Sequence, residues 1–260
     1  MRADVYLVAM GYTASRKKAQ DLIDGGAVRV DGVTVKKSSA TIDETVPHEV
    51  KVEQLFRYVS RGGMKLEGAL DAFRVNVNRK KAVDVGASTG GFTDCLLQRG
   101  ASRVISVDSG IGQLHESLRA DPRVVVVEQF NARELNETVT EGPCDVAVMD
   151  VSFISQTYLI EGVASVLKDG GEFISLIKPQ FEAGKSALGK GGIVRNSAYR
   201  YLAIKRVLEC ATACGFDCMG VIPSPIEGGD GNREYLAYFI KQPSLVPRIE
   251  DRMLKRIAEL

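Results

Sequence analysis

From residue 81 onward, short apolar runs alternate with amphipathic stretches, and this alternation restricts the fold more than any other feature. The runs that predict strands are Lys81–Val85, Arg103–Val107, Val124–Gln129, Asp145–Met149 and Gly171–Ile177. The stretches between the first three, and Gln156–Leu167, have the pattern of helices. Repeated strand–helix units form a parallel sheet with right-handed crossovers. We therefore predict a doubly wound, Rossmann-like α/β domain over residues 81–260.

The last part of the chain departs from this pattern. Two apolar runs, Phe216–Pro223 and Glu234–Ile240, flank a glycine-rich turn at residues 228–232. Strands joined by such a turn pair antiparallel, so we expect this pair at the edge of the sheet. Residues 248–260 predict an amphipathic helix that packs on the sheet. Residues 179–195 predict a long loop, and loops of this length are commonly functional.

The first 60 residues have another organisation. Short helices are predicted over Asp4–Met10 and from Ser15, a suitable N-cap, to Asp24. The Asp31-Gly32 pair between two alternating apolar runs, 27–30 and 33–36, is a strong hairpin signal. We predict a small α+β domain over residues 1–60, with residues 61–80 as an interdomain linker and the start of the larger domain.

Composition restricts the location and the partners. The formal net charge is only +1, so any surface for nucleic acid must come from local clusters. The five cysteines and the absence of a signal-peptide pattern or a long apolar run predict a cytoplasmic protein with reduced thiols. Cys210, Cys214 and Cys218 repeat every four residues, but neither histidine has a spacing that would complete a zinc site. We predict no metal.

A glycine-rich turn, Gly86-Ala-Ser88-Thr-Gly90-Gly91-Phe92, follows the first predicted strand of the large domain. Dinucleotide binding is one interpretation, but the G-x-G-x-x-G pattern needs a glycine where Ser88 stands. A hydrolase elbow, G-x-S-x-G, is matched literally, but it needs an acid and then a histidine later in the chain. His115 is the last histidine and lies too close to Ser88 for that layout. A pocket for S-adenosylmethionine is the third interpretation.

The third interpretation is supported by polar residues at the ends of consecutive strands. Asp84 lies beside the turn, while Asp108, Asn131 and Asp150 follow the next three strands. A ligand at the carboxyl edge of such a sheet would use an acid or amide at these positions. Each residue alone could equally cap the following helix. The predicted cofactor-binding set is Asp84, Gly86, Ser88, Thr89, Gly90, Gly91, Phe92, Asp108, Asn131 and Asp150.

Four ionisable residues predict the chemistry: Lys65, Asp150, Lys178 and Glu234. Lys178 ends a buried apolar strand, where a cation is costly unless it is paired. Methyl transfer to a ribose 2′-hydroxyl needs that oxygen aimed at the methyl group and relieved of its proton. A lysine can act as the base, and carboxylates can hold and orient the cations. The alternative for each residue alone is an ordinary surface ion pair.

The order of these four residues, with the loop 84–94, resembles the Lys-Asp-Lys-Glu tetrad of the FtsJ/RrmJ group of ribose 2′-O-methyltransferases. More narrowly, the chain resembles the TlyA family of ribosomal RNA methyltransferases, also called haemolysin A. The matching segments are 58–67, 150–155, 176–182 and 231–235. The resemblance implies S-adenosylmethionine-dependent 2′-O-methylation of cytidine in ribosomal RNA, with Lys178 central to deprotonation.

The segments 2–8 and 15–32 resemble the RNA-binding domain of the ribosomal protein S-four type. Cations in the first turn of a helix oppose its dipole, and a phosphate partner would explain the three consecutive ones at residues 16–18. A solvated charged face is the alternative. The predicted RNA-binding residues are Arg16, Lys17, Lys18, Arg29, Lys36, Lys37 and Arg61. The predicted partners are ribosomal RNA or ribosomal subunits, and the competing functions are a non-catalytic RNA-binding protein and a membrane-acting haemolysin.

Overall fold

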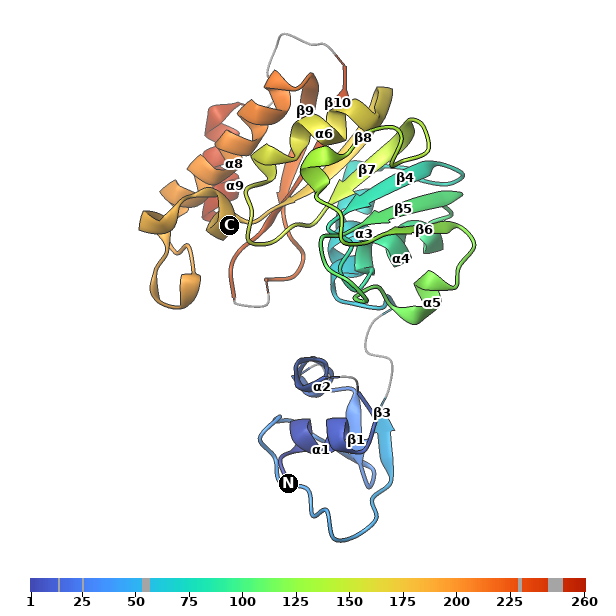
Figure 1. Ribbon diagram of the computed structural model, residues 1–260. Helices are drawn as coiled ribbons and strands as arrows, with labels where there is room; N and C mark the ends of the chain where they lie inside the picture. Colours follow the sequence, from blue (N-terminus) through green and yellow to red (C-terminus); the bar gives the residue numbers. More distant parts are fainter. Residues whose placement is uncertain (14, 25, 53–56, 229–230, 243–249) are drawn as a thin grey trace. The chain divides into compact units, whose positions relative to one another are not determined.

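The computed structural model describes residues 1–13, 15–24, 26–52, 57–228, 231–242 and 250–260, without the side chains of Lys17, Lys18 and Asp21. The chain divides into two units, Met1–Arg57 and Tyr58–Leu260 (Figure 1). Residues 58–80 belong to the second unit, which therefore begins three residues before the predicted boundary.

The small unit packs two helices on a three-stranded antiparallel sheet. The helices are α1 (Ala3–Ala9) and α2 (Arg16–Asp24), and the strands β1 (Val28–Val30), β2 (Val33–Thr34) and β3 (Val50–Val52) have the order β2-β1-β3. The predicted hairpin is present: Val30 pairs with Val33, and Asp31 and Gly32 both have positive φ, at 51° and 79°. Two such residues form the turn that matches the twist of paired strands. The third strand was not predicted.

The large unit is built on a seven-stranded sheet with the order β6-β5-β4-β7-β8-β10-β9. Its strands are β4 (Lys81–Val85), β5 (Arg103–Val107), β6 (Val124–Val127), β7 (Cys144–Met149), β8 (Leu167–Ile177), β9 (Phe216–Pro223) and β10 (Tyr235–Lys241). The first five are parallel, and β10 runs antiparallel between β8 and β9. The chain order reverses between β4 and β7, and doubly wound folds bind ligands outside the carboxyl ends of the strands at such a point.

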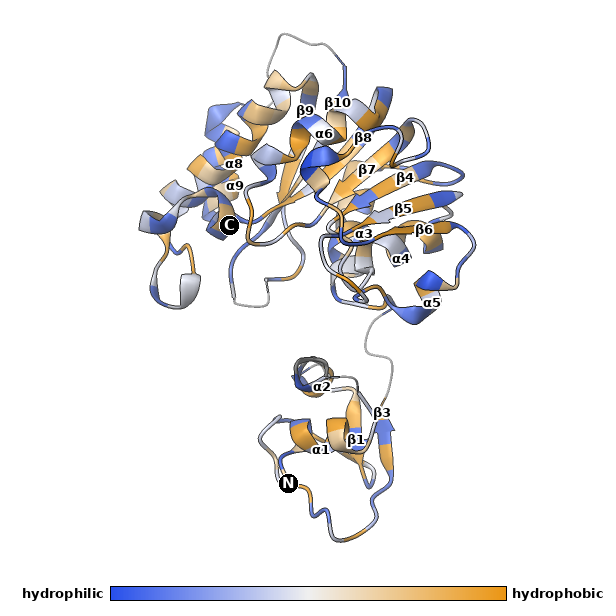
Figure 2. Cartoon of the chain, in the orientation of Figure 1, coloured by the Kyte–Doolittle hydropathy of each residue, from blue (hydrophilic) through white to orange (hydrophobic). Residues whose placement is uncertain are grey.

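Helices cover both faces of this sheet. One face packs on α6 (Ile160–Val166), α8 (Ser197–Ala213) and α9 (Asp251–Glu259), and the other on α3 (Gly62–Phe73), α4 (Gly91–Gln98) and α5 (Glu116–Arg119) (Figure 1). The short helix α7 (Pro179–Glu182) and the 3-10 turns η1 (Ala132–Glu134), η2 (Gln156–Tyr158), η3 (Lys185–Ala187) and η4 (Lys190–Gly192) lie in the connections. The central strands are hydrophobic along most of their length (Figure 2), as expected for a sheet buried on both faces.

Three predicted segments differ in detail. Residues 62–73 form the packed helix α3, where part of a linker was expected. Strand β6 ends at Val127 rather than at Gln129, because Gln129 has a left-handed backbone with φ 54°. The predicted loop 179–195 contains α7, η3 and η4. The antiparallel pair β9–β10 at the sheet edge is confirmed.

Candidate active site

The four predicted catalytic residues form two buried lysine–carboxylate pairs. Lys65 Nζ donates to Glu234 Oε2 over 2.5 Å, and Lys178 Nζ lies 2.6 Å from Asp150 Oδ1. Lys65, Lys178 and Glu234 are each less than a tenth exposed. Burying such charges is tolerable only because each has its partner, and removing one partner from a pair of this kind is strongly destabilising.

Strand register explains why the two pairs lie at one edge of the sheet. Tyr235 of β10 pairs with Ile177 of β8, so Glu234 and Lys178 lie next to each other at the end of this ladder. Asp150 follows Met149 on β7, which pairs with β8 on its other side. Lys65 reaches Glu234 from α3, which packs against β10. The structure therefore brings the four residues together from four separate elements.

The segment after β7 adds two residues that sequence reasoning missed. Ser152 Oγ accepts a hydrogen bond of 2.8 Å from Lys178 Nζ. Phe153 has φ 65°, a left-handed conformation that is an outlier for a bulky residue, and it is 92% exposed. Its ring contacts that of Phe181, at 5.2 Å between centroids. An aromatic residue four positions after a buried strand, next to Ser152, was the available signal.

Asp84, under the glycine-rich turn, is fully buried. Its Oδ2 accepts a hydrogen bond of 2.7 Å from Thr93 Oγ1, which also contacts Ser106 Oγ, whereas Asp84 Oδ1 is buried and has no hydrogen-bond partner among the described residues. Burial, opposed by the hydrogen bond from Thr93, raises the pKa of Asp84 to about 7. A carboxyl group in this position is close to the balance between its neutral and charged forms at physiological pH.

Asp108 joins the turn to the end of β5. Its two oxygens each accept one backbone N–H, from Ser88 at 2.8 Å and from Gly110 at 2.7 Å. Asn131 lies near it, because Phe130 N–H donates to the Asp108 carbonyl. The Asn131 side chain accepts from Arg133 N–H and so caps η1, as the alternative interpretation stated.

The rest of the predicted loop packs against neighbouring elements. Gly91 touches the segment before α3 so closely that a Cβ there would lie 2.2 Å from Ser60 Oγ. Gly90, with φ 97°, has no room beside Leu118 for a side chain. Phe92 is buried in the core between α3 and α4. Gly86 and Ser88 also have left-handed φ values, and the Thr89 carbonyl accepts from His115 N–H.

In the small unit, the predicted RNA-binding residue Arg16 has a partner within the protein. Arg16 Nη2 donates to Asp4 Oδ2 over 3.2 Å, and the same buried carboxylate accepts from Arg2 and Gln20. These hydrogen bonds hold the pKa of Asp4 well below its usual range. Asp4 is therefore the anionic partner of Arg16, which lies in the first turn of α2.

The other predicted RNA-binding residues differ in exposure. Arg29, Lys36 and Lys37 are exposed in the small unit, while Arg61 is half-buried at the start of α3 in the large unit. The side chains of Lys17 and Lys18 lie outside the described residues.

The three regularly spaced cysteines lie on two different elements. Cys210 and Cys214 are on and just after α8, whereas Cys218 is on β9 and donates to the Gly220 carbonyl. Throughout the described ranges, no group of three or more histidine, cysteine, aspartate or glutamate side chains could hold a metal ion. Burial raises the pKa of Cys218 to about 12, so this thiol is not a reactive thiolate.

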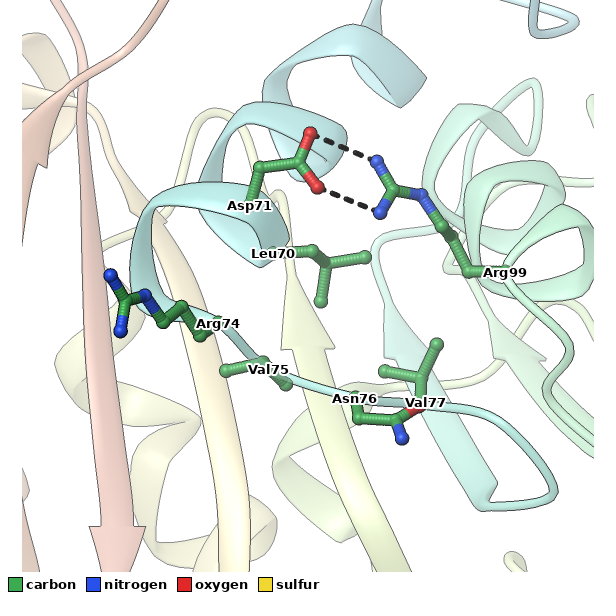
Figure 3. Close-up of a pocket in the computed structure, with 7 residues that line it drawn as sticks. All are labelled: Leu70, Asp71, Arg74, Val75, Asn76, Val77 and Arg99. Atoms are coloured by element: carbon green, nitrogen blue, oxygen red, sulfur yellow. Dashed lines mark hydrogen bonds and ion pairs between the residues drawn. The ribbon is translucent and has the colours of Figure 1, made fainter.

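A surface pocket of about 380 Å³ lies where α3 ends and β4 begins (Figure 3). It is lined by Leu70, Asp71, Arg74, Val75, Asn76, Val77 and Arg99. Asp71 and Arg99 face each other in a two-bonded ion pair, at 2.7 and 3.0 Å. Because residues 70–77 precede β4 and Arg99 precedes β5, the pocket is at the amino edge of the sheet, opposite to the two lysine–carboxylate pairs.

Comparison with known proteins places both units. A model of the FtsJ-like methyltransferase family matches residues 58–241, and a model of the S4 domain matches residues 1–45. Within the described part of the chain, the helices are too short or too polar to span a membrane.

Individual relatives match nearly the whole chain. The 16S/23S rRNA (cytidine-2′-O)-methyltransferase TlyA of Mycobacterium tuberculosis is 39% identical, over 99% of this chain and 97% of that protein. A solved structure from Streptococcus thermophilus that carries a hemolysin name is 40% identical, with a TM-score of 0.80 over 100% of this chain and 94% of that one. An S-adenosylmethionine-dependent methyltransferase from Mesorhizobium loti, 17% identical, shares the fold with a TM-score of 0.50 over 68% of this chain and 98% of its own.

Proposed function

The chain belongs to the FtsJ-like methyltransferase family, among relatives of the TlyA type, and on this premise we propose that it methylates the ribose 2′-oxygen of cytidine in ribosomal RNA with S-adenosylmethionine as methyl donor. The observation that carries the proposal is the convergence of Lys65, Glu234, Lys178 and Asp150 at the carboxyl edge of the sheet. A protein that only bound RNA would have no use for four ionisable groups that meet in the large unit.

The residues at the end of β4 and β5 fit the methyl donor. Each Asp108 oxygen accepts one backbone N–H and keeps a lone pair, so the carboxylate can also accept the two hydroxyls of the donor's ribose. The turn 86–91 and the Asn131 segment would enclose the rest of the molecule, with Asp84 and its unpartnered Oδ1 beneath it. S-Adenosylmethionine, when bound, supplies a methyl group on a sulfonium that an oxygen nucleophile can attack.

Lys178 is positioned to handle the proton of the 2′-hydroxyl. Its amino group is held by Asp150 Oδ1 on one side and Ser152 Oγ on the other, which aims it as a general base must be aimed. Lys178 Nζ passes one proton to Asp150 and takes the hydroxyl proton as the oxygen–carbon bond forms, so that the step leaves a Lys178 ammonium group beside a neutral Asp150 carboxyl group. The bound methyl donor would release its methyl group to this oxygen and would keep the electron pair of the carbon–sulfur bond on sulfur. Lys65 and Glu234 orient the ribose from the same edge.

Recognition of RNA is divided between the two units. In the small unit Arg29, Lys36 and Lys37, with Lys17 and Lys18, contact phosphates, which position RNA without reading its sequence. Arg61 contributes from the start of α3. At the active site the exposed ring of Phe153 stacks on an unpaired base, as aromatic side chains do in single-stranded RNA recognition. This function places the protein in the cytoplasm with the ribosomes.

The proposal is tested with purified protein, methyl-labelled S-adenosylmethionine and ribosomal subunits or free ribosomal RNA. We expect label in RNA at the 2′-oxygen of specific cytidines, mapped by resistance to alkaline cleavage, and no label with the Lys178→Met variant. RNA binding without methyl incorporation would leave only the binding module. Leakage of liposomes at low protein concentration would instead favour a membrane-acting protein.

A further inference from the structure

Two segments at the active site are joined by an ordered series of side-chain contacts. One segment follows β7 and contains residues 150–156, and the other follows β8 and contains residues 178–182. Asp150 and Ser152 contact Lys178, and Phe153 contacts Phe181. At the far end, Ser155 Oγ donates to Glu182 Oε2 over 2.5 Å and Gln156 N–H donates to Glu182 Oε1 over 2.8 Å. The contacts thus extend the β7–β8 pairing beyond the strands themselves.

Glu182 is an unusual residue for such a place. Its carboxyl group is 3% exposed, and both of the donors that it accepts from are neutral groups. Burial raises the pKa of Glu182, because it penalises the charged form. The nearby Arg206 of α8 donates to the Glu182 main-chain carbonyl instead. Burying a neutral side chain would cost less free energy. The carboxylate is therefore needed for the two hydrogen bonds that it accepts at once.

The partner of Glu182 is itself fixed to the sheet. Gln156 is 1% exposed, its Nε2 donates to the Leu176 carbonyl over 3.2 Å, and its Oε1 accepts from Ser175 Oγ. Gln156 therefore ties the end of the 150–156 segment to β8, and Glu182 ties it to the segment that begins with Lys178. Ser152 and the strained, exposed Phe153 lie between this anchored end and Asp150, which contacts Lys178 at the other end of the segment.

We propose that Glu182 is a positioning residue for methyl transfer: by accepting from Ser155 and Gln156 it holds the 150–156 segment in the one arrangement that keeps Asp150 and Ser152 on the Lys178 amino group. It touches neither substrate nor methyl donor. This inference rests on the proposed function for its kinetic test, but the predicted loosening of the segment is measurable without catalysis.

The test compares Glu182→Ala, Glu182→Gln and a control, Thr140→Val. Thr140 is fully buried and loses two hydrogen bonds in the control, to the Asn136 and Gly142 carbonyls, before β7 and at the opposite edge of the sheet. We expect Glu182→Ala to lower kcat by up to about a hundredfold, because a misplacement of catalytic groups by about 1 Å can have an effect of this size. The KM for RNA and the KM for S-adenosylmethionine should change little. Glu182→Gln keeps an acceptor for Gln156 N–H and a group that can pair with Ser155, so it should retain most of kcat.

Amide hydrogen exchange supplies the second readout. Residues 150–158 should exchange faster in Glu182→Ala than in wild type or Thr140→Val, at matched overall stability. Equal loss of kcat in Glu182→Gln and Glu182→Ala, unchanged kcat in Glu182→Ala, or unchanged exchange would each overturn the proposal. Should Glu182→Ala not fold, Ser155→Ala, which removes one of the two donors, must show a smaller loss of kcat in the same direction. A wild-type protein that transfers no methyl group would refute the proposed function, while the exchange experiment would still decide on the positioning role.

Discussion

Lys178 and Asp150 form one of two lysine–aspartate pairs that join β7 to β8, and the two pairs lie at opposite ends of these strands. Lys178 Nζ is 2.6 Å from Asp150 Oδ1 after the carboxyl ends, and Lys168 Nζ is 2.6 Å from Asp145 Oδ1 near the amino ends. The distances are equal, but the side chains of the second pair are 50% and 29% exposed, whereas those of the first pair are 11% and 20% exposed. The chain thus contains its own control for the role of the buried pair.

Lys178→Met should abolish methyl transfer while cofactor binding survives, because the glycine-rich turn and Asp108 do not depend on this side chain. Loss of a general base costs roughly 10²- to 10⁴-fold in rate. Methyl incorporation and calorimetric binding of S-adenosylmethionine measure the two effects. Lys168→Met breaks the exposed pair of the same strands and should retain full activity. Full activity in Lys178→Met would remove Lys178 from the mechanism.

Glu234→Ala leaves the buried Lys65 ammonium without its partner and should destabilise the protein by about 3–5 kcal/mol, measured by urea unfolding. The double variant Lys65→Met with Glu234→Leu removes both charges, and its stability should return close to that of wild type. Methyl transfer should stay lost in the double variant, since stability without the pair does not restore the site. An active double variant would show that the pair serves only the fold.

Asp84 makes stability depend on pH. Its pKa of about 7 in the folded protein lies above its value near 4 in an unfolded chain. The folded state therefore keeps a proton that the unfolded chain releases. The contribution of this bound proton to the stability of the folded state is complete below about pH 4 and is lost as the pH rises through about 7.

The Asp84→Asn variant keeps an acceptor for Thr93 and should be more stable than wild type. The gap between the free energies of unfolding of the variant and of wild type should be larger at pH 8 than at pH 5. The difference between these gaps should be on the order of 2–3 kcal/mol, measured by urea unfolding. Asp169→Asn, at a fully exposed aspartate, is the control for charge removal alone. A gap that does not grow with pH would contradict the raised pKa.

Phe153→Gly should separate RNA recognition from folding. Glycine adopts positive φ without strain, so stability should be unchanged or higher. Loss of base stacking, worth about 1–3 kcal/mol per base, should weaken RNA binding roughly 5- to 150-fold, seen as a higher KM for RNA. Phe153→Tyr keeps a stacking ring and should behave as wild type. An unchanged KM in Phe153→Gly would mean that no base stacks there.

The basic residues at the start of α2 should have two different effects. Lys17→Ala with Lys18→Ala should weaken RNA binding and lower its salt dependence, because fewer phosphate contacts release fewer counterions. Arg16→Ala should instead destabilise the small unit, since Asp4 loses one of its donors. Binding at several salt concentrations and thermal unfolding distinguish these outcomes. An unchanged salt slope in the lysine variant would exclude a phosphate role for both lysines.

Much of the fold could be predicted because its signals are local. Alternating apolar runs give the strands, and Asp31-Gly32 gives the hairpin through the backbone that these two residues adopt easily. Helix α3 was not predicted because the glycines at its start are poor helix formers. It is stabilised by packing against α4 and β10, a tertiary effect.

The candidate site was predictable as a set of residues but not as a geometry. Motif and chain order select Lys65, Asp150, Lys178 and Glu234, yet nothing local indicates which lysine pairs with which acid. Glu182 lies within one of the matching segments, but its role depends on Ser155 and Gln156, which come from another strand connection. Arg16 was assigned to RNA because its partner Asp4 is on a different helix.

The hairpin that supplies Glu234 has a consequence for synthesis of the protein. Lys65 is synthesised 169 residues before its counter-ion, Glu234. Strand β10 must insert between β8 and β9 before Lys65 and Glu234 can pair. A nascent chain that lacks β10 therefore has Lys65 without its counter-ion, although the glycine-rich turn has already been synthesised. Methyl transfer by the proposed mechanism therefore cannot begin until β10 has been synthesised.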